Sequence, residues 1–328
     1  MLFRSADYLD ARGLEALAGL CQGVTTEFEN VPAQALEYLA SHCRVSPAAT
    51  AVSIAQDRIR EKAFVRSCGL GTAPFAAIMT AEDIESVPET LFPAILKVSR
   101  LGYDGKGQVR IADRGEARAA FTDLSCVPCV LEKRMHLVCE LSVVIARDEH
   151  GATAVYPVAE NEHANGILVT SIVPARVDDA IAGRARDAVL AIANGLQYVG
   201  VLCVEFFMLE GNVLVVNEIA PRPHNSGHYT IDACVTSQFE QQARVLAALP
   251  LGATEQHCPA VMMNLLGDLW REGEPDWRRV LTHPRAKLHL YGKREPRPGR
   301  KMGHVTCLGA TVEEALATAE QIRSELRF

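Results

Sequence analysis

A long apolar hairpin is the feature that most constrains how this chain can fold. Residues 204–218 read VEFFMLEGNVLVVNE, two strand-forming runs separated by Gly211 and Asn212. A Gly-Asn pair between two such runs is typical of a two-residue hairpin loop. With that loop, Glu205 lies directly opposite Glu218 on one face of the hairpin, with the two Cβ atoms roughly 5 Å apart. The chain must therefore hold two acidic side chains together at one end of an otherwise apolar element.

Two like charges at this distance destabilise a sheet unless something lies between them. A divalent cation is one solution, because Mg²⁺ takes carboxylate oxygens as ligands and often phosphates as well. The alternatives are that one glutamate is protonated, or that the strand ends are solvated and hold no metal. The pairing also depends on the register, since a slip of one residue would separate the carboxylates.

The overall composition excludes several classes of protein. The chain has 328 residues, of which 48% are hydrophobic, enough for two or three domains with a substantial core. A formal net charge of −7 argues against broad nucleic-acid binding, which needs a basic surface. No apolar run is long enough to span a bilayer, and the first residues lack a signal-peptide pattern. We therefore expect a cytoplasmic protein without membrane or nucleic-acid partners.

The ten cysteines mostly occupy apolar contexts, as expected for small core residues of a cytosolic chain. Cys126 and Cys129 have C-x-x-C spacing, but no second such pair is present to complete a zinc site. A strand rather than a helix is expected after the pair, which also argues against a redox motif. We therefore expect neither a metal centre nor a redox centre there.

Helical and strand patterns alternate along the chain, which predicts an α/β protein with α+β elements. The expected helices span residues 9–22, 33–41, 50–68, 116–123, 178–196 and 231–248. The expected strands are the hairpin runs 201–209 and 213–219, together with 94–98, 108–111, 130–132, 140–144 and a strand beginning at Val24. A smaller basic segment follows the last helix. No strand precedes the first helix, so the parallel α/β layer at the front looks incomplete.

A glycine-rich loop joins two of the expected strands. Residues 99–108 read SRLGYDGKGQ, with three glycines in six residues. Such a loop lets the backbone approach phosphates closely, and Lys97 and Lys106 flank it. It matches neither a P-loop nor a dinucleotide fingerprint, because it links two strands rather than a strand and a helix. A flexible hairpin tip is the alternative, although Lys97 at an inward strand position needs an anion.

Two further polar clusters indicate a substrate site. The hairpin continues into residues 219–229, which read IAPRPHNSGHY, and the alternative there is a hydrogen-bonded turn. Residues 287–304 form a local basic cluster suited to phosphate contacts. For this cluster the alternatives are a solvated surface loop and a small RNA-binding patch. These features together indicate phosphoryl transfer from ATP, which uses a glycine loop, a lysine, a carboxylate pair and a polar pocket.

Several motifs resemble the N5-carboxyaminoimidazole ribonucleotide synthase family, which are ATP-grasp enzymes of purine biosynthesis. The matching stretches are TEFENVP (26–32), AQDRIREK (55–62), GYDGKGQ (102–108), NEIAPRPHNSGHYT (217–230), MNLLGD (263–268) and YGKREPRPGRKMGHVT (291–306). They are spread over nearly the whole chain, and NEIAPRPHNSGH together with RPGRKMGH is specific to this family. The resemblance implies an ATP-grasp fold in three parts. They are a truncated N-terminal parallel α/β domain at 1–60, an ATP-grasp domain at 61–250 with a lid at 73–135, and a small C-terminal domain at 251–328.

The resemblance also implies the reaction, a carbon–nitrogen ligation that forms ADP. ATP phosphorylates bicarbonate to carboxyphosphate, and the amine of 5-aminoimidazole ribonucleotide takes the carboxyl group from it directly or from CO₂ released in the pocket. The cofactors would be ATP and Mg²⁺, and the chain would form a homodimer. The rivals are another ATP-grasp carboxylase or ligase, such as a biotin carboxylase or a glycinamide ribonucleotide enzyme, and a catalytically incomplete nucleotide-binding protein.

Residue by residue, the resemblance implies three groups of site residues. Those for ATP are Arg58, Lys97, Gly102, Tyr103, Asp104, Gly105, Lys106, Gly107, Gln108, Glu132, Lys133, Arg134, Met135, Glu140, His163, Asn217 and Glu218. Those for Mg²⁺ are Glu205 and Glu218. Those for the ribonucleotide are Tyr103, Arg222, Asn225, Ser226, Lys293, Arg300 and Lys301. The catalytic groups are Asp104, Arg222, His224 and Lys293, with Asp104 and His224 as the first candidates for the base that deprotonates the amine.

The chain departs from the family pattern at three places. Leu101 stands where the family usually has a glycine, which would stiffen the lid. Arg134 and Met135 replace an apolar pair in the adenine-contacting linker, which is tolerable if backbone groups read the adenine. The family also opens with a strand, a G-G-G-Q-L-G turn that helps to bind the ribonucleotide, and a second strand–helix unit. We expect the reading frame upstream of Met1 to encode these units.

Overall fold

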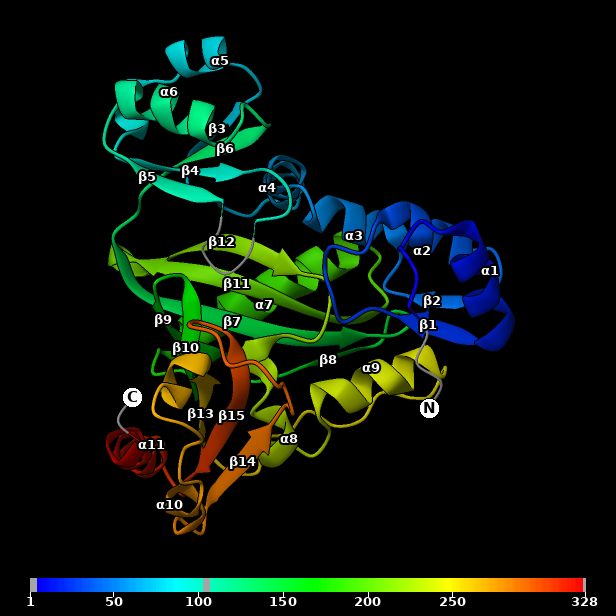
Figure 1. Ribbon diagram of the computed structural model, residues 1–328, viewed down its shortest axis with the longest axis vertical. Coiled ribbons are helices and arrows are strands. Elements are labelled where there is room, and N and C mark those ends of the chain that lie inside the picture. Colours follow the sequence, from blue (N-terminus) through cyan, green and yellow to red (C-terminus); the bar gives the residue numbers. More distant parts are fainter. Residues whose placement is uncertain (1–4, 103–106, 327–328) are drawn as a thin grey trace.

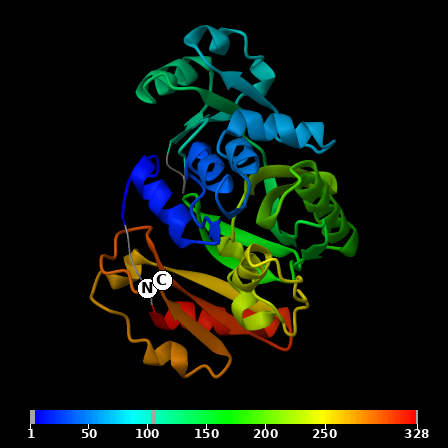
Figure 2. The same ribbon diagram turned by 90° about the vertical axis from the view of Figure 1, so that its right-hand side faces the viewer.

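The structure is a computed structural model that describes residues 5–102 and 107–326. A lid made of a small sheet and two helices forms one end of the molecule, and a large sheet runs through the middle (Figure 1). The last strands of the chain form the opposite end, and a second view confirms this arrangement (Figure 2). A small N-terminal unit lies beside the large sheet. The site described below lies between the lid and the large sheet.

The N-terminal unit is built on two short parallel strands, β1 (Gly23–Thr25) and β2 (Arg44–Ser46). Its helices are α1 (Ala11–Leu20), α2 (Ala33–Ala40) and α3 (Ala49–Ala55). Leu36 and Val52 are buried in its small core, where α2 packs against α3. The strand and the two helices predicted before residue 42 are therefore confirmed.

The single helix predicted at 50–68 is wrong, because α3 and a separate helix α4 (Arg58–Ser67) replace it. Asp57 between them has an extended backbone, with φ −126° and ψ 106°. Its carboxylate accepts hydrogen bonds from two N–H groups in the first turn of α4. Asp57 is thus an N-cap, and its short acceptor side chain competes with continuation of the helix. The break lets Arg58 reach Glu218.

The lid is an antiparallel sheet in the order β3-β6-β4-β5. Its elements are β3 (Phe75–Ile78), α5 (Ala81–Glu85), a 3₁₀ turn (Glu89–Leu91), β4 (Ala94–Val98), β5 (Gln108–Ile111), α6 (Arg114–Asp123) and β6 (Cys129–Lys133). The two helices cover the face that points away from the large sheet (Figure 1). Because side chains alternate along a strand, Leu96 enters the lid core while Lys97 reaches the cleft below.

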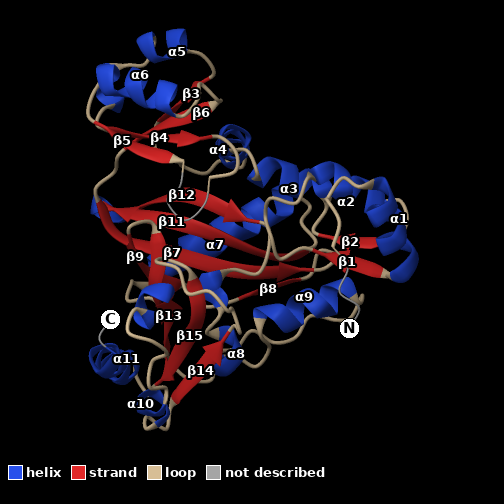
Figure 3. Ribbon diagram, viewed as in Figure 1, coloured by secondary structure: helices blue, strands red, loops and turns tan. Residues whose placement is uncertain are grey.

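The large sheet has nine strands in the order β12-β11-β7-β9-β10-β13-β15-β14, with β8 paired to β7 (Figure 3). Its strands are β7 (Leu137–Arg147), β8 (Thr153–Val155), β9 (Ala159–Ala164), β10 (Ile167–Val173), β11 (Gly200–Leu209), β12 (Val213–Ala220), β13 (Ala260–Leu266), β14 (Ala286–Leu290) and β15 (Lys301–Leu308). Helix α7 (Asp179–Gly195) packs against β7 and β11. Their shared core includes Val189, Ile192 and Val204.

The C-terminal strands continue the large sheet, because β13 pairs with β10. The short helix α10 (Arg278–Leu281) packs on β14, and α11 (Val312–Leu326) packs on β13 and β15. The helix predicted at 231–248 is wrong, because α8 (Thr230–Ala233) and α9 (Gln238–Leu246) replace it. Ser237 ends the gap between them as the N-cap of α9. Within the described residues, no helix has both the length and the apolar composition that a bilayer crossing needs.

The predicted pairing of Glu205 with Glu218 is confirmed, but the predicted two-residue loop is wrong. Residues 210–212 form a three-residue 3₁₀ turn, in which Gly211 adopts a left-handed φ of 70°. This turn shifts the hairpin register by one residue. Asn217 then forms a β-bulge that shifts it back before the two glutamates meet. The two offsets cancel, so the carboxylates end up opposite each other.

Candidate functional site

A cleft of about 1250 Å³ lies between the lid and the large sheet. Among the predicted site residues, those that line it are Arg58, Lys97, Gln108, Glu140, His163, Glu205, Asn217, Glu218, Arg222, His224, Asn225, Lys293 and Lys301. The predicted residues Tyr103, Asp104, Gly105 and Lys106 lie outside the described residues. The chain thus brings together, from distant parts of the sequence, most of the residues that the motifs indicated.

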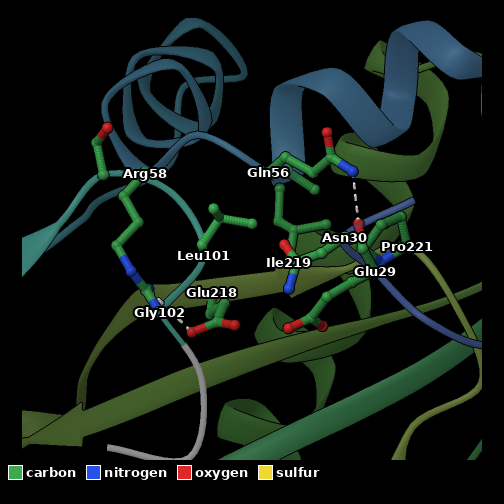
Figure 4. A pocket seen from close by; sticks show the side chains of 11 residues that line it. Glu29, Asn30, Gln56, Arg58, Leu101, Gly102, Glu218, Ile219 and Pro221 are labelled. Carbon is green, nitrogen blue, oxygen red and sulfur yellow. Dashed lines mark hydrogen bonds and ion pairs between the residues drawn. The ribbon is translucent and has the colours of Figure 1, made fainter. Parts of the chain in front are cut away.

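The paired glutamates lie beside Arg58 in this cleft. Arg58 Nη1 is 3.0 Å from Glu218 Oε2 (Figure 4). Burial, together with the charge of Glu218, raises the pKa of Glu205 to about 7. Burial would also raise the pKa of Glu218, but the Arg58 guanidinium holds it below its usual value. Among the described ion pairs, Glu205 contacts only the His224 ring, so its charge is the less compensated of the two. A divalent cation between two such carboxylates would supply the missing compensation.

The anion that Lys97 was expected to need is the carboxylate of Glu132, inside the lid. Its Nζ is 3.1 Å from Glu132 Oε2, and Lys62 Nζ of α4 is 3.2 Å from Glu132 Oε1. Burial lowers the pKa of Lys97 even though Glu132 opposes this shift. Glu132 is 2% exposed and does not line the cleft. The three side chains tie the lid to α4 and hold Lys97 at the cleft wall.

The rest of the predicted adenine linker lies beside Glu132 and also does not line the cleft. The backbone N–H groups of Lys133 and Arg134 donate to the carbonyl oxygens of Pro74 and Pro93, at 2.8 and 2.9 Å. Those two donors are therefore used within the lid. The predicted backbone contact to adenine is therefore left to the carbonyl groups of this linker or to Met135.

Glu140 and His163 form a second polar pair in the cleft, with Nδ1 of the ring 2.9 Å from Glu140 Oε2. The two residues come from the neighbouring strands β7 and β9. Burial lowers the pKa of His163, but the hydrogen bond to Glu140 and the charge of Glu205 outweigh it and raise the pKa overall. This pair places an imidazole whose protonated form is favoured near the carboxylates.

Sequence reasoning assigned no role to residues 27–29, which the structure places in the cleft. Glu29 Oε2 accepts a hydrogen bond from Arg222 Nε at 3.0 Å, and Phe28 is 51% exposed. The acidic–aromatic–acidic run directly after β1 was the available signal. Arg110 and Asn165 also line the cleft and were missed, and nothing in their local sequence sets them apart from ordinary strand and loop residues. His228 and Tyr291 line it as well, and both lie in the polar clusters that indicated a substrate site, but neither was assigned a role.

The loop after β12 presents Asn225 and Ser226 in opposite directions. Asn225 lines the cleft, and both polar atoms of its amide are buried without a hydrogen-bond partner. An unpaired buried amide costs free energy, so Asn225 suits a ligand that offers both a donor and an acceptor. Ser226 is fully buried and does not line the cleft. Its hydroxyl instead lies 2.8 Å from His224 Nδ1.

The C-terminal basic cluster contributes one wall of the cleft. Lys293 Nζ donates to the Lys301 carbonyl at 2.7 Å and lies 5.2 Å from the centre of the Tyr291 ring. Both lysines and Tyr291 line the cleft. Arg300 does not, and its guanidinium donates to the Glu295 carbonyl at 2.8 Å. The structure thus separates Lys301 from its neighbour, although both were predicted to hold the ribonucleotide.

Asp232, His289 and His304 bring potential metal ligands within 4.8 Å of one another behind this wall. The two imidazole rings are stacked, with centroids 4.4 Å apart and planes at 13°. Ring nitrogens bind metals in the ring plane at roughly 2 Å, so nearly parallel rings do not converge on one ion. Instead, His289 contacts Asp232 at 2.8 Å, and His304 Nδ1 contacts the Tyr291 hydroxyl at 2.9 Å. We interpret the cluster as a hydrogen-bonded support for Tyr291.

The start of the glycine loop lines a smaller pocket beside Arg58 and Glu218 (Figure 4). Leu101 in this pocket has φ 63° and is 71% exposed. This left-handed conformation favours glycine, the residue that the resemblance led us to expect at this position. Gly107, on the other side of the loop, has φ 71°. The chain keeps a glycine conformation at Leu101 without the glycine.

Three family models match the chain. The ATP-grasp domain matches residues 63–239, and the phosphoribosylaminoimidazole carboxylase C-terminal domain matches residues 260–318. The ribonucleotide synthetase preATP-grasp domain matches residues 2–56. The matched stretches follow the order of the three parts that the motifs implied.

Two curated relatives with high identity are both N5-carboxyaminoimidazole ribonucleotide synthases. An N5-carboxyaminoimidazole ribonucleotide synthase of Brucella melitensis is 46% identical over 92% of this chain and 83% of its own length. That of Bacillus subtilis is 42% identical over 94% of this chain and 81% of its own.

Solved structures agree with these relatives. An ADP complex of an N5-carboxyaminoimidazole ribonucleotide synthetase has a TM-score of 0.90 and 38% identity, covering 97% of this chain and 84% of the other. The Aspergillus clavatus enzyme with ADP and 5-aminoimidazole ribonucleotide has a TM-score of 0.89 and 30% identity, covering 98% and 86%.

Proposed function

The chain belongs to the N5-carboxyaminoimidazole ribonucleotide synthase family, and from that premise we propose how its cleft works. It is an ATP-dependent ligase of purine biosynthesis that carboxylates 5-aminoimidazole ribonucleotide. In the proposed route, a bicarbonate oxygen attacks the γ-phosphorus of ATP and ADP leaves. The substrate amine then attacks the carboxyl carbon of carboxyphosphate, or CO₂ released from it. Phosphate is the leaving group, and a base takes the amine proton.

The single observation that carries this proposal is the Glu205–Glu218 pair in the cleft. Two facing carboxylates, of which one has a pKa raised to about 7, fit the oxygen ligands of Mg²⁺. When bound, the ion would neutralise charge on the phosphates of ATP during transfer. The amide of Asn217 donates to Glu205 Oε2 at 3.3 Å and orients this carboxylate.

The phosphate side of the cleft is formed by Arg58 and Lys97. Arg58 is held by Glu218, and Lys97 is held by Glu132. Both cations are therefore fixed before a ligand arrives, which lowers the entropy that binding would cost. A guanidinium offers five N–H donors, so Arg58 can keep one bond to Glu218 and still contact a phosphate.

The opposite side of the cleft suits the ribonucleotide. It presents Arg222, the unpaired amide of Asn225 and the lysines Lys293 and Lys301. A pocket for one small molecule typically measures about 300–1,000 Å³. The cleft exceeds that range at about 1250 Å³, which supports room for ATP and a second nucleotide together.

ADP release is the experiment that tests this proposal. The 328-residue chain is assayed with Mg·ATP alone, with bicarbonate added, and with bicarbonate and 5-aminoimidazole ribonucleotide together. We expect release that depends on bicarbonate and rises sharply with the ribonucleotide, and a carboxylated product in equal amount. ADP release without the carboxylated product would indicate that the chain hydrolyses ATP but does not carboxylate the ribonucleotide. Mg·ATP binding without release would favour the catalytically incomplete nucleotide-binding protein.

Glu218→Gln and Glu210→Gln are matched variants for this assay. Both replace one glutamate of the same hairpin, but Glu210 is exposed in the turn and does not line the cleft. Only Glu218→Gln should abolish release. Equal activity of the two variants would contradict the proposed metal pair.

Two further expectations rest on the family resemblance, a homodimer and a cytoplasmic location. Light scattering of the purified chain tests the first, and a molar mass twice that of one chain is expected. Fluorescence microscopy of a tagged chain in its own cell tests the second. Neither expectation affects the roles proposed for the cleft residues.

A further inference from the structure

A row of buried polar side chains runs across the large sheet and ends at His224. It consists of Ser171 on β10, Asn161 on β9, Ser142 on β7 and Ser226 in the loop after β12, and each is at most 5% exposed. No member of the row lines the cleft, so the row does not contact a ligand there. Polar side chains are seldom fully buried unless they are hydrogen-bonded. The row therefore acts through the one residue at its end that does line the cleft.

The hydrogen bonds in the row all point the same way. Ser171 Oγ donates to Asn161 Oδ1 at 2.7 Å, and Asn161 Nδ2 donates to Ser142 Oγ at 2.8 Å. Ser142 Oγ then donates to Ser226 Oγ at 2.8 Å. Because the Ser226 hydroxyl accepts from Ser142, its own proton is available for His224 Nδ1, 2.8 Å away.

A second donor at the same nitrogen favours the same state of the His224 ring. The backbone N–H of Ser226 also points at Nδ1, at 3.3 Å. A backbone N–H has no lone pair to offer, so this contact requires a lone pair on Nδ1. The ring proton then resides on Nε2, which lies 3.3 Å from Glu205 Oε1. Two donors on one side and a carboxylate on the other select the same tautomer.

We propose that this row locks His224 in the Nε2–H tautomer, so that the ring presents its N–H to the Glu205 carboxylate 3.3 Å away and does not serve as a base. Ser226 and Ser142 are then positioning residues, and Ser226 is not a ribonucleotide contact. The tautomer follows from the hydrogen bonds alone. Only the purpose of holding Glu205, as a ligand of Mg²⁺, rests on the proposed function. Of the two candidate bases, the inference removes His224.

Nitrogen NMR of the histidine rings tests the tautomer directly. The ¹⁵N-labelled chain without ligands is compared with a His224→Asn variant, which identifies the His224 signals among the ten histidines. We expect an unprotonated Nδ1 and a protonated Nε2 at His224. A protonated Nδ1 in the wild-type chain would overturn the inference. This readout needs no turnover, so a chain that fails to release ADP can still show the expected tautomer.

Ser226→Ala and Ser142→Ala test the row itself. Each removes the hydroxyl donor to Nδ1 or the bond that orients it and leaves only the longer 3.3 Å contact from the backbone N–H of residue 226, so part of the His224 population should shift to the Nδ1–H tautomer. Each should also lower kcat about 10-fold or more, with the KM for ATP unchanged. Ser46→Ala is the matched control. Ser46 is equally buried and donates to the Val199 carbonyl at 2.8 Å outside the row, so its loss should leave both readouts unchanged. If both row variants keep the wild-type tautomer, the row does not lock the ring and the inference fails. If one variant does not fold, the other decides.

Discussion

At the scale of single residues, the proposed metal pair implies that Glu205 lowers the stability of the chain without ligand. Its buried charge faces Glu218, and the repulsion between the two carboxylates destabilises the folded chain when no cation lies between them. We predict that Glu205→Gln lowers ADP release at least about 100-fold, because a direct metal ligand matters at least as much as its supporting groups. The same change should not lower the free energy of unfolding without ligand. Activity assays and urea denaturation check the two halves separately.

The hairpin supplies the control for that experiment. Glu210→Gln should change neither activity nor stability, since Glu210 is exposed at the turn. A Glu205→Gln chain that unfolds more easily than the wild type would show that this carboxylate is structural rather than poised for a ligand.

Glu61 on α4 predicts a pH dependence of stability. It is 1% exposed, Oε1 accepts from the Ile219 N–H, and Oε2 has no hydrogen-bond partner. Burial and the charge of Glu218 raise its pKa from 4.5 to about 8. Between these values the folded chain binds more protons than the unfolded chain, so the contribution of Glu61 to stability falls as pH rises. We predict that Glu61→Gln removes this fall.

Urea denaturation from pH 5 to pH 9 measures the effect of Glu61→Gln. The wild-type free energy of unfolding should drop more steeply than that of the variant, by on the order of a few kcal/mol over the range. The variant should be the more stable chain above the raised pKa. Parallel curves for the two chains would show that the Glu61 carboxyl does not titrate in this range.

The site shows how far single residues could be predicted. Glu205 and Glu218 were located by counting positions in a hairpin, and Asn225 and Lys301 by motif resemblance. The row from Ser171 to Ser226 could not be found, because hydrogen bonds between residues on different strands leave no periodic signal in the sequence. The contact of Glu132 with ATP stays a prediction, and in the structure Glu132 pairs with Lys62 and Lys97. For Ser226, the hydrogen bond to His224 led us to propose a positioning role in place of the predicted ribonucleotide contact.

At the scale of elements, short polar side chains decide where helices end. The hydrophobic pattern of 50–68 is continuous, so it predicted one helix, yet Asp57 breaks it by capping α4. We predict that Asp57→Ala lowers the free energy of unfolding by about 1 kcal/mol and that Asp57→Asn lowers it much less, because asparagine is an equally good cap. Urea denaturation checks both. Equal losses in the two variants would assign the effect to the contact of Asp57 with Arg100, at 3.2 Å, instead of to capping.

The same variants address function, since the cap sets the position of Arg58. If the α3–α4 break serves the site, Asp57→Ala should raise the KM for ATP while Asp57→Asn leaves it near the wild-type value. The hairpin shows in the same way that the ends of elements are harder to predict than their pairing. Its pairing was predicted correctly although the turn was wrong and the bulge was not foreseen, because the two one-residue offsets cancel.

At the scale of the whole molecule, the order of the strands in the large sheet could not be predicted from the sequence. The chain returns after α9 to add β13 beside β10, and β15 beside β13. Antiparallel neighbours that are far apart in sequence carry no local signature, so these strands were read only as a basic segment. Their placement explains why a cluster near residue 300 forms a wall of a cleft whose floor comes from β11 and β12.

This placement yields a prediction that separates two adjacent cations. Lys301 lines the cleft, whereas Arg300 is turned to the Glu295 carbonyl. We predict that Lys301→Met raises the KM for 5-aminoimidazole ribonucleotide about 10-fold, because a charge-assisted contact contributes roughly 1.5 kcal/mol. Arg300→Met should change it less than about 2-fold. The KM for ATP should stay constant in both, since Arg58 and Lys97 form the other side of the cleft.

Initial rates at varied concentrations of the ribonucleotide and of ATP measure both KM values in each variant. A larger effect from Arg300 would mean that the strand binds the substrate in a different orientation, and a shift in the ATP KM would place the two nucleotides the other way round.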